Sequence, residues 1–286
     1  MQAATRTANT LLEALPYIQM HAGTTIVVKL GGNAMVEPRA AQAVAQDVVL
    51  MERVGIRTIV VHGAGPKITE TMEKQGLEAQ FVEGLRVTDD ATIEIAQMVL
   101  VGLTGKEIVA EIEALQAKAA SICGLDGSCI RVRKAERSGA DLGWVGEVVA
   151  VDPLLINTLA GSGHVVVISP IGVGPEGHAY NINADHAAGH IAAAVGAAKI
   201  VNLTNVAGLL GDPQDPESLI SSLSLVEARQ MLSSGAVSSG MIPKLEGCII
   251  ALEGGVQRAH LIDGTLSHSL LMELFTDTGI GTMIEP

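Results

Sequence analysis

Five short runs rich in valine, isoleucine and leucine recur along the chain, and their recurrence constrains the fold more than any other feature. Most of them end in a glycine-rich or polar turn and are followed by a segment with helical periodicity. Alternating strand and helix patterns are typical of α/β proteins in which helices cover a mainly parallel sheet. We therefore expect a bilobed, three-layer αβα sandwich around a mainly parallel open sheet. The runs occupy residues 24–30, 57–66, 163–172, 198–208 and 256–264.

Helical patterns fill most of the intervals between these runs. The pattern over residues 91–119 contains Gly102 and Gly105 near its centre, which predicts one broken helix or two consecutive helices. Residues 128–136 and 144–152 are shorter strand patterns, and we expect them to form a hairpin rather than crossover strands. The other helical patterns cover residues 37–55, 183–197 and 240–255.

The first 22 residues stand apart from this alternation. Four apolar side chains recur there at helical spacing, which predicts a separate amphipathic helix. A weaker break near Gly196 divides the remainder of the chain. We therefore expect an N-terminal helix (1–22), an N-terminal lobe (23–196) and a C-terminal lobe (197–286). The four apolar residues are Leu11, Leu12, Leu15 and Ile18.

Charge and composition narrow the class of function. The 286 residues carry a net charge of −13 and show no cluster of lysine and arginine, which argues against a nucleic-acid partner. Negative net charge also repels anions at long range, so an anionic ligand needs local lysines and backbone N–H groups. Hydrophobic residues make up 48% of the chain, enough for a sizeable core, but no stretch approaches the ~20 apolar residues of a membrane span.

The cysteines and the N-terminal segment indicate the compartment. Cys123, Cys129 and Cys248 have no metal-like spacing, and free thiols fit a reducing cytoplasm. Residues 1–19 lack the continuous apolar core of a signal peptide. We therefore expect a cytoplasmic protein with no contact with a membrane and no protein-bound metal centre.

Polar and glycine-rich residues end the first two apolar runs. Lys29 is followed by Gly31 and Gly32, and the sequence HGAGP over residues 62–66 ends the second run. Ligands of open α/β sheets bind beyond the carboxyl ends of the strands, where glycines let backbone N–H groups approach an anion closely. The chain has no G-x-x-x-x-G-K-[ST] loop, and no G-x-G-x-x-G fingerprint opens its first helix after the first apolar run. These turns therefore indicate either an anion site of another kind or ordinary strand-to-helix connections.

Arg86 and His62 each allow two interpretations. Arg86 lies in a polar turn before a helical pattern, where its guanidinium suits a carboxylate ligand or pairs on the surface with Asp89 or Glu83. His62 is a turn or packing histidine or a general base. The chain shows no Ser-His-Asp or Cys-His signature, which favours the packing role.

Two helix starts carry more polar residues than capping requires. Asn181, Asn183 and Asp185 lie within five residues, and capping accounts for one of them. Lys244 lies in the first turn of the helical pattern that follows Gly240, where the helix dipole disfavours a cation. Both places are therefore candidates for a functional site, although a solvated Lys244 is the alternative.

Taken together, these motifs resemble the amino acid kinase family. The resemblance covers nearly the whole chain and is carried, in order, by VVKLGGNAM, VVHGAGP, GLRVTDD, DLGWVGEV, ISPIGV, YNINAD, LTNVAGLL, GMIPK and ELFTDTGIGTMI. Within the family the chain is similar to members that phosphorylate the side-chain carboxylate of N-acetyl-L-glutamate in arginine biosynthesis. The resemblance implies that ATP is used, with Mg²⁺ bound through the nucleotide phosphates. It implies no general base, because a glutamate-like carboxylate is already ionised at neutral pH.

The resemblance also implies roles for individual residues. Lys29 and Lys244 would flank the transferring phosphoryl group, and Asp185 would hold and orient both lysines. Gly31 and Gly32 would cradle the phosphoryl oxygens. The substrate would contact Gly63, Ala64, Gly65, Arg86 and Asn181. The nucleotide would contact Thr204, Asn205, Val206, Gly208 and Leu209.

Two positions depart from the family pattern. Ala64 stands where the family usually has the middle of three glycines, so its methyl group is expected to crowd the substrate. If the position needs a positive φ, an alanine there also costs on the order of 1 kcal/mol or more. Asn205 stands where the family has an aspartate, which removes a charge beside the implied nucleotide site. Both changes bear on ligand binding, while Lys29, Asp185 and Lys244 are intact.

The N-terminal segment resembles the extra helix of the arginine-inhibited members of the family, whose helices interlace dimers into a hexameric ring. By that resemblance L-arginine is the expected effector and a hexamer, a trimer of dimers, is the expected assembly. The resemblance also admits a nitrogen-signalling PII protein as a partner. A helix packed on its own subunit is the alternative. The implied effector site comprises Tyr17, Lys199, His268, Glu273, Gly279 and Gly281.

Two rival functions stay open on sequence alone. A kinase for N-acetylaminoadipate differs in its substrate by one methylene, which is worth only about 1–3 kcal/mol of discrimination. A catalytically weak, arginine-binding paralogue is the other rival, and it rests on Ala64 and Asn205.

Overall fold

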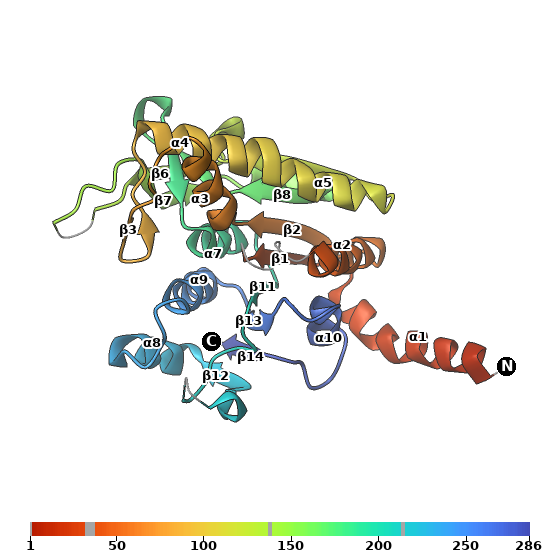
Figure 1. The fold of residues 1–286 in the computed structure, drawn as a ribbon. Coiled ribbons are helices and arrows are strands. Elements are labelled where there is room, and N and C mark those ends of the chain that lie inside the picture. The colour runs from red at the N-terminus through yellow and green to blue at the C-terminus, as the bar shows by residue number, and fades with distance from the viewer. Residues whose placement is uncertain (1, 32–37, 137–138, 213–214) are drawn as a thin grey trace.

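The computed structural model describes residues 2–31, 38–136, 139–212 and 215–286. Its main sheet follows the order β12 (Ser222–Ser224), β14 (Thr282–Glu285), β13 (Arg258–Asp263), β11 (Lys199–Thr204), β1 (Thr25–Leu30), β2 (Arg57–His62), β8 (Val165–Ser169) and β5 (Ala119–Cys123) (Figure 1). All neighbouring strands pair in parallel except β13 and β14. The mainly parallel sheet predicted from the sequence is confirmed, and the five apolar runs supply its central strands.

Helices cover both faces of this sheet. One face packs against α6 (Leu154–Gly161), α7 (Ala184–Ala194), α8 (Leu225–Ser234) and α9 (Ile242–Glu253). The other packs against α2 (Pro38–Arg53), α5 (Gly105–Ala114) and α10 (Ser269–Leu274). Side chains alternate along a strand, so Ile26 and Val28 enter the second core while Val27 enters the first. Lys29 shares the face of Val27 and therefore points towards α7. The predicted three-layer arrangement is confirmed.

A small closed barrel accompanies the main sheet. It consists of β6 (Ile130–Lys134), β7 (Val145–Val151), β9 (Ile171–Val173) and β10 (Ala179–Ile182). Antiparallel pairing of β6 with β7 confirms the predicted hairpin. The sequence pattern did not reveal the closure by β9 and β10. Pro170 separates β8 from β9, so a single apolar run contributes to both sheets.

The long helical pattern after residue 90 continues without a break. It consists of α4 (Asp90–Gln97), a π-helical segment η2 (Met98–Thr104) and α5. Gly102 lies inside the π-helical segment and Gly105 begins α5, so the two glycines mark a wide turn. The remaining elements are α3 (Gly65–Lys74), β3 (Phe81–Val82), β4 (Leu85–Arg86), η3 (Asp126–Ser128), η4 (Pro175–Gly177) and η5 (Pro216–Ser218).

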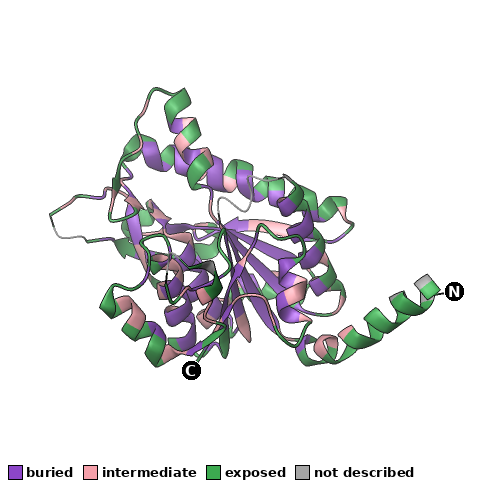
Figure 2. Cartoon of the chain, turned by 60° about the horizontal axis from the view of Figure 1, so that its bottom comes forward, coloured by how far each residue is buried: buried purple, intermediate pink, exposed green. Residues whose placement is uncertain are grey.

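Helix α1 (Gln2–His21) projects away from the rest of the chain, and most of its residues are exposed (Figure 2). Its apolar stripe lacks cover, since Leu11 and Leu12 are 66% and 65% exposed. The predicted separate helix is therefore present. Among the described residues, none of the helices combines the length and apolarity needed to cross a bilayer.

Candidate active site

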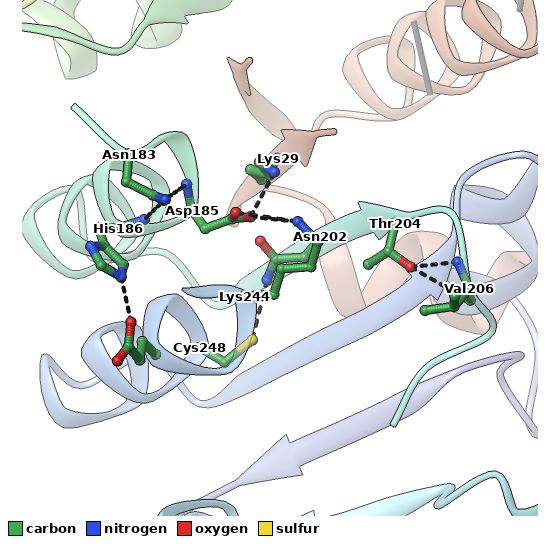
Figure 3. A network of polar contacts seen from close by, with 10 residues as sticks. Lys29, Asn183, Asp185, His186, Asn202, Thr204, Val206, Lys244 and Cys248 are labelled. Atoms are coloured by element: carbon green, nitrogen blue, oxygen red, sulfur yellow. Dashed lines mark hydrogen bonds and ion pairs between the residues drawn. The ribbon is translucent and has the colours of Figure 1, made fainter. Parts of the chain in front are cut away.

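Three charged side chains meet where β1, α7 and α9 approach one another (Figure 3). Lys29 Nζ lies 2.6 Å from Asp185 Oδ1, and Lys244 Nζ lies 3.2 Å from Asp185 Oδ2. The Asn183 side chain accepts hydrogen bonds from the backbone N–H groups of Asp185 and His186, so Asn183 is the one of the three polar residues that caps α7, and it holds Asp185 in the first turn. The structure therefore brings together the three residues that the family resemblance implied, from three separate segments.

Burial and charge set the protonation of this group. Asp185 is 5% exposed and burial opposes its ionisation, but the attraction of Lys29 and Lys244 outweighs burial and lowers the pKa of Asp185. Burial also lowers the pKa of Lys29, with Lys244 acting in the same direction and Asp185 opposing it. Two ammonium groups and one carboxylate leave a local positive excess. Such a group attracts an anion despite the net charge of −13.

A pocket of about 160 Å³ opens beside this charged group. That volume is below the roughly 300–1,000 Å³ usual for drug-sized ligands, so the pocket suits a small metabolite. All five residues implied as substrate contacts line it, namely Gly63, Ala64, Gly65, Arg86 and Asn181. They come from the β2–α3 turn, β4 and β10, which are far apart in sequence. Asn183 and Ala184 also line the pocket and connect it to Asp185.

Arg86 is buried in the wall of this pocket, at 7% exposure. Its Nη2 donates to the carbonyl oxygen of Gly65 at 2.9 Å and to Thr69 Oγ1 at 2.7 Å, and its guanidinium lies 4.7 Å from the ring centroid of Phe81. Burial lowers the pKa of Arg86. The alternative of a surface arginine is wrong, because the side chain is fixed in the pocket wall by α3.

The backbone at Ala64 removes one of the two concerns about that residue, the cost of a positive φ. Its φ is −149°, which lies outside the left-handed region, so an alanine adopts it without strain. Its methyl group is buried in a cluster with Ile68 and Met72. The sequence-based concern that this position needs a glycine for a positive φ is wrong.

The two glycine turns use part of their N–H groups internally. Gly31 N donates to the carbonyl oxygen of Leu203 at 3.3 Å, and Gly63 N donates to that of Leu30 at 3.1 Å. A Cβ at Gly31 would lie 3.0 Å from the Leu203 carbonyl oxygen, so the close approach of β1 and β11 favours a glycine here. Gly32 lies outside the described residues.

The implied nucleotide segment lies beyond the carboxyl end of β11. Thr204 Oγ1 accepts from the N–H of Val206 and donates to its carbonyl oxygen, which forms a local turn. Asn205 and Val206 are exposed, whereas Gly208 and Leu209 are buried. Leu209 N donates to Thr282 Oγ1, so β14 holds the far end of the segment. The missing charge at Asn205 therefore concerns a solvated position.

Sequence reasoning missed two residues near the charged group. Asn202 is paired in register with Lys29 and is fully buried, with its Nδ2 donating to Cys248 Sγ at 3.2 Å. Its Oδ1 has no hydrogen-bond partner among the described residues. An asparagine inside the apolar run KIVNLT was the available signal. Leu100, from the π-helical segment, lines the substrate pocket, and only the tertiary structure reveals it.

His62 is a structural residue beneath the pocket. It is fully buried, and its Nε2 lies 3.0 Å from Ser169 Oγ, which donates to the carbonyl oxygen of Leu100 at 3.1 Å. Burial lowers the pKa of His62 to about 4, so the ring is neutral at pH 7. The packing role favoured from the sequence agrees with this position.

The six implied effector residues lie around α10, the C-terminal turn and the inner end of α1. Glu273 Oε1 lies 2.6 Å from His260 Nδ1, and its Oε2 accepts from Ile280 N at 2.6 Å. Gly279 packs under this carboxylate. Burial lowers the pKa of Lys199, and Glu273 lies close enough to raise it.

Three further contacts complete the region of the implied effector residues. They join Tyr17 with Asp277, His268 with Asp47, and Gly281 with the Leu261 carbonyl oxygen.

The comparisons with known proteins agree with this geometry. The acetylglutamate kinase of Moorella thermoacetica is 50% identical over 284 residues, covering 96% of either chain. That of Symbiobacterium thermophilum is 51% identical over 289 residues, covering 99% of either chain. The acetylglutamate kinase of Nostoc is 48% identical over 283 residues, covering 99% of this chain and 95% of that one.

Solved structures agree on the fold. The N-acetylglutamate synthase of Neisseria gonorrhoeae, complexed with coenzyme A and N-acetyl-glutamate, matches with a TM-score of 0.86 at 28% identity, covering 98% of this chain and 63% of that one. The same synthase complexed with coenzyme A and L-arginine matches with a TM-score of 0.80. Carbamate kinase from Giardia lamblia, bound to AMP-PNP, matches with a TM-score of 0.67 at 15% identity, covering 93% of this chain and 99% of that one.

The family model described as "Amino acid kinase family" matches residues 24–263. The chain therefore belongs to the amino acid kinase family and, within it, to the acetylglutamate kinases.

Proposed function

We propose that this chain transfers the γ-phosphoryl group of ATP to the side-chain carboxylate of N-acetyl-L-glutamate, giving N-acetylglutamyl 5-phosphate and ADP. The observation that carries the proposal is the Lys29–Asp185–Lys244 group, which the pocket residue Ala184 connects directly to a small pocket lined by Arg86 and Asn181. About 50% identity to several acetylglutamate kinases over nearly the whole chain supports it.

The residue types suit phosphoryl transfer. Such a reaction asks mainly for alignment of the two substrates and for stabilisation of charge on the phosphoryl oxygens. Lys29 and Lys244 supply two ammonium groups from opposite sides, and Asp185 positions both of them. Arg86 supplies a guanidinium for a carboxylate of the substrate. A carboxylate nucleophile needs no base at neutral pH, so the neutral His62 beneath the pocket is not required for proton transfer.

In this proposal Mg²⁺ is bound to the site as part of the Mg–ATP complex. Among the described residues no three His, Cys, Asp or Glu side chains lie close enough together to hold a metal ion. Mg²⁺ would be bound through the phosphates of ATP, where it neutralises part of their charge. The exposed turn at Asn205 and Val206 and the helix α9 behind Lys244 are the proposed nucleotide side.

We assign the parts of the chain accordingly. Residues 23–196 contribute the pocket and are proposed as the amino acid lobe. Residues 197–286 contribute Lys244 and the Thr204–Leu209 segment and are proposed as the nucleotide lobe. Residues 1–22, which contain the protruding α1, are proposed as an assembly element.

The test is ATP-dependent formation of an acyl phosphate, trapped with hydroxylamine. N-acetyl-L-glutamate, N-acetyl-L-aminoadipate and free L-glutamate are compared as substrates at equal concentration. Product with N-acetyl-L-glutamate at least tenfold above the other two supports the proposal. Preference for the longer substrate would reassign the chain to the aminoadipate reaction. No product from any substrate, in folded protein, would refute kinase activity.

We also propose L-arginine as an effector and a hexamer as the assembly. The buried Glu273 carboxylate, with Lys199 nearby and Gly279 beneath it, offers groups of both charges for an amino acid ligand. Tyr17 ties α1 to Asp277 in the C-terminal turn, so a ligand there would contact the element that carries the exposed Leu11 and Leu12. The structural relative complexed with L-arginine adds support.

Two measurements test the effector proposal. Calorimetry with L-arginine should show saturable binding that Glu273→Gln weakens at least tenfold, and arginine should inhibit the wild-type reaction. Light scattering should give a hexamer that Leu11→Asp/Leu12→Asp reduces to smaller species. A monomer or dimer that does not respond to millimolar arginine would contradict both parts. Binding of a PII protein is a separate proposal, tested by co-elution.

A further inference from the structure

Helices α7 and α9 approach one another through two glycines. Gly189 lies in the middle of α7 and Gly247 in the middle of α9, and both are buried. A glycine in a helix interior costs ~1 kcal/mol relative to alanine, so a helix that keeps one has a packing reason for it. Here the packing reason is reciprocal, because each glycine faces the backbone of the other helix.

The space at these glycines is too small for a methyl group. A Cβ built on Gly247 would lie 2.5 Å from the carbonyl oxygen of Asp185 and 2.9 Å from its carbonyl carbon. A Cβ on Gly189 would lie within 3.0 Å of the Gly247 carbonyl oxygen. These neighbours are backbone atoms of helices, so no side chain can rotate away. The contact therefore sets how closely the two helices approach.

The same contact lies next to the proposed catalytic group. Gly189 follows Asp185 by four residues, and Gly247 follows Lys244 by three, so in each helix the glycine and the charged residue share one face. The backbone atom that Gly247 touches belongs to Asp185 itself. Lys29, in contrast, reaches Asp185 from β1, which is a separate element from α9.

We propose that Gly247 and Gly189 are positioning residues that set the distance between Lys244 and Asp185, and thereby the place of one of the two phosphoryl-binding lysines. This inference rests on the proposed kinase function. A methyl group at Gly247 must move α9 outward by about 1 Å to reach ordinary van der Waals distance. Lys244 Nζ, now 3.2 Å from Asp185 Oδ2, would then lie beyond ion-pair range. The Lys29–Asp185 contact and the substrate pocket would stay in place.

A displaced Lys244 should change kcat while leaving the KM for N-acetyl-L-glutamate nearly unchanged. A misplacement of about 1 Å in a catalytic group can reduce turnover by about 100-fold. We expect Gly247→Ala to lower kcat by about that factor. The KM for N-acetyl-L-glutamate should stay within threefold, because none of the residues that line the pocket belongs to α9. A general loss of stability would not separate kcat from KM in this way once rates are normalised to folded protein.

Gly254 provides a matched control at the far end of the same helix pair. A Cβ there would meet the Cβ of Ala193 at a comparably short distance. Gly254 lies ten residues after Lys244, or about 15 Å along the helix. Gly254→Ala should therefore lower the melting temperature as much as Gly247→Ala while keeping kcat within threefold of wild type. Gly240→Ala is a second control, because a Cβ built on Gly240 has no atom within 4 Å. It measures the effect of a glycine-to-alanine change just before α9 that creates no steric contact.

The experiment measures kcat, KM and thermal stability of the wild type and the three variants, with crystal structures of wild type and Gly247→Ala. A 100-fold loss of kcat confined to Gly247→Ala, with Lys244 Nζ more than 4 Å from Asp185, supports the inference. An unchanged kcat in Gly247→Ala, or an equal loss in Gly254→Ala, overturns it. If the Gly247→Ala variant does not fold, the Gly189→Ala variant is used in its place, because its methyl group meets the same contact between α7 and α9.

Failure of the proposed function gives a different result. In that case the wild-type chain forms no acyl phosphate, so kcat cannot be used to test the role of Gly247 and Gly189. The distance between Lys244 and Asp185 in the two crystal structures then decides the positional inference by itself.

Discussion

The two sides of the proposed transfer site are built differently. On the substrate side, Arg86 is buried and held by Gly65 and Thr69 from another element, and Ala64 is packed with Ile68. On the nucleotide side, Thr204 contacts Val206 two residues away, and Asn205 is exposed. The first side is therefore fixed by long-range packing before any ligand arrives, whereas the second is a local turn open to solvent. Preformed packing favours discrimination between small substrates, which suits the lobe that must recognise one acylated amino acid.

The largest effect should come from Lys29, which lies between the two sides. Lys29→Met keeps the aliphatic stem and removes the ammonium group that contacts Asp185. We expect kcat to fall by about 10³-fold, because one donor to developing charge is typically worth 10²–10³. Neither KM should change more than threefold. Circular dichroism and the melting temperature check the fold, and a folded variant with full turnover would contradict the role of Lys29.

A smaller effect, confined to the substrate side, is expected for Arg86. Arg86→Ala removes a charge-assisted contact worth about 1.5–3 kcal/mol, so the KM for N-acetyl-L-glutamate should rise on the order of 10–100-fold. The KM for ATP should stay within threefold. Steady-state kinetics with each substrate varied in turn make the comparison. Equal changes in both KM values would show that the two sides are not independent.

The next effect is a pH dependence of the free energy of unfolding, and it comes from His62, which lies beneath the substrate pocket. The pKa of His62 is lowered from 6.5 to about 4 by burial, so the folded chain binds fewer protons at this ring than the unfolded chain does. Stability from the neutral ring is complete above pH ~6.5 and is lost as the pH falls towards 4. At pH 5.5 the loss should be about 1 kcal/mol relative to pH 7.5. Urea unfolding at both pH values should show this difference reduced in His62→Gln, and an equal pH dependence would contradict it.

A still smaller kinetic effect is expected at the first departure from the family pattern. Ala64→Gly gives the residue type usual in the family, but φ at this position is −149°, so the backbone gains nothing. We expect kcat and both KM values to change by less than about twofold, and stability to fall by ~1 kcal/mol through the lost buried methyl group. A tenfold gain in substrate affinity would show instead that the methyl group crowds the pocket.

The smallest effect is expected on the nucleotide side. Asn205→Asp restores the charge usual in the family at an exposed position. Solvent screens such a charge, so the KM for ATP should change by less than about threefold. Titration with Mg-ATP at low and at physiological salt checks this. A large effect would mean that the turn becomes buried when the nucleotide binds, and the contrast between the two sides would then hold only for the free protein.

The sequence by itself determined the class of fold and most of the charged site. Short apolar runs alternate with helical patterns, and that local signal predicts the sheet and its two helical layers. Lys29 and Asp185 are recognisable because each places polar chemistry at a strand end or a helix start, which is where ligands of such folds bind.

Only the tertiary structure decided the rest, because the remaining features arise between segments far apart in sequence. The closure of the barrel, the burial of Arg86 and the placement of Leu100 in the pocket depend on long-range packing. The backbone angle at Ala64 is likewise invisible in a residue pattern. The approach of Gly247 to Asp185 is the clearest case, since a glycine inside a helix shows only that something comes close, and the folded chain shows what it is.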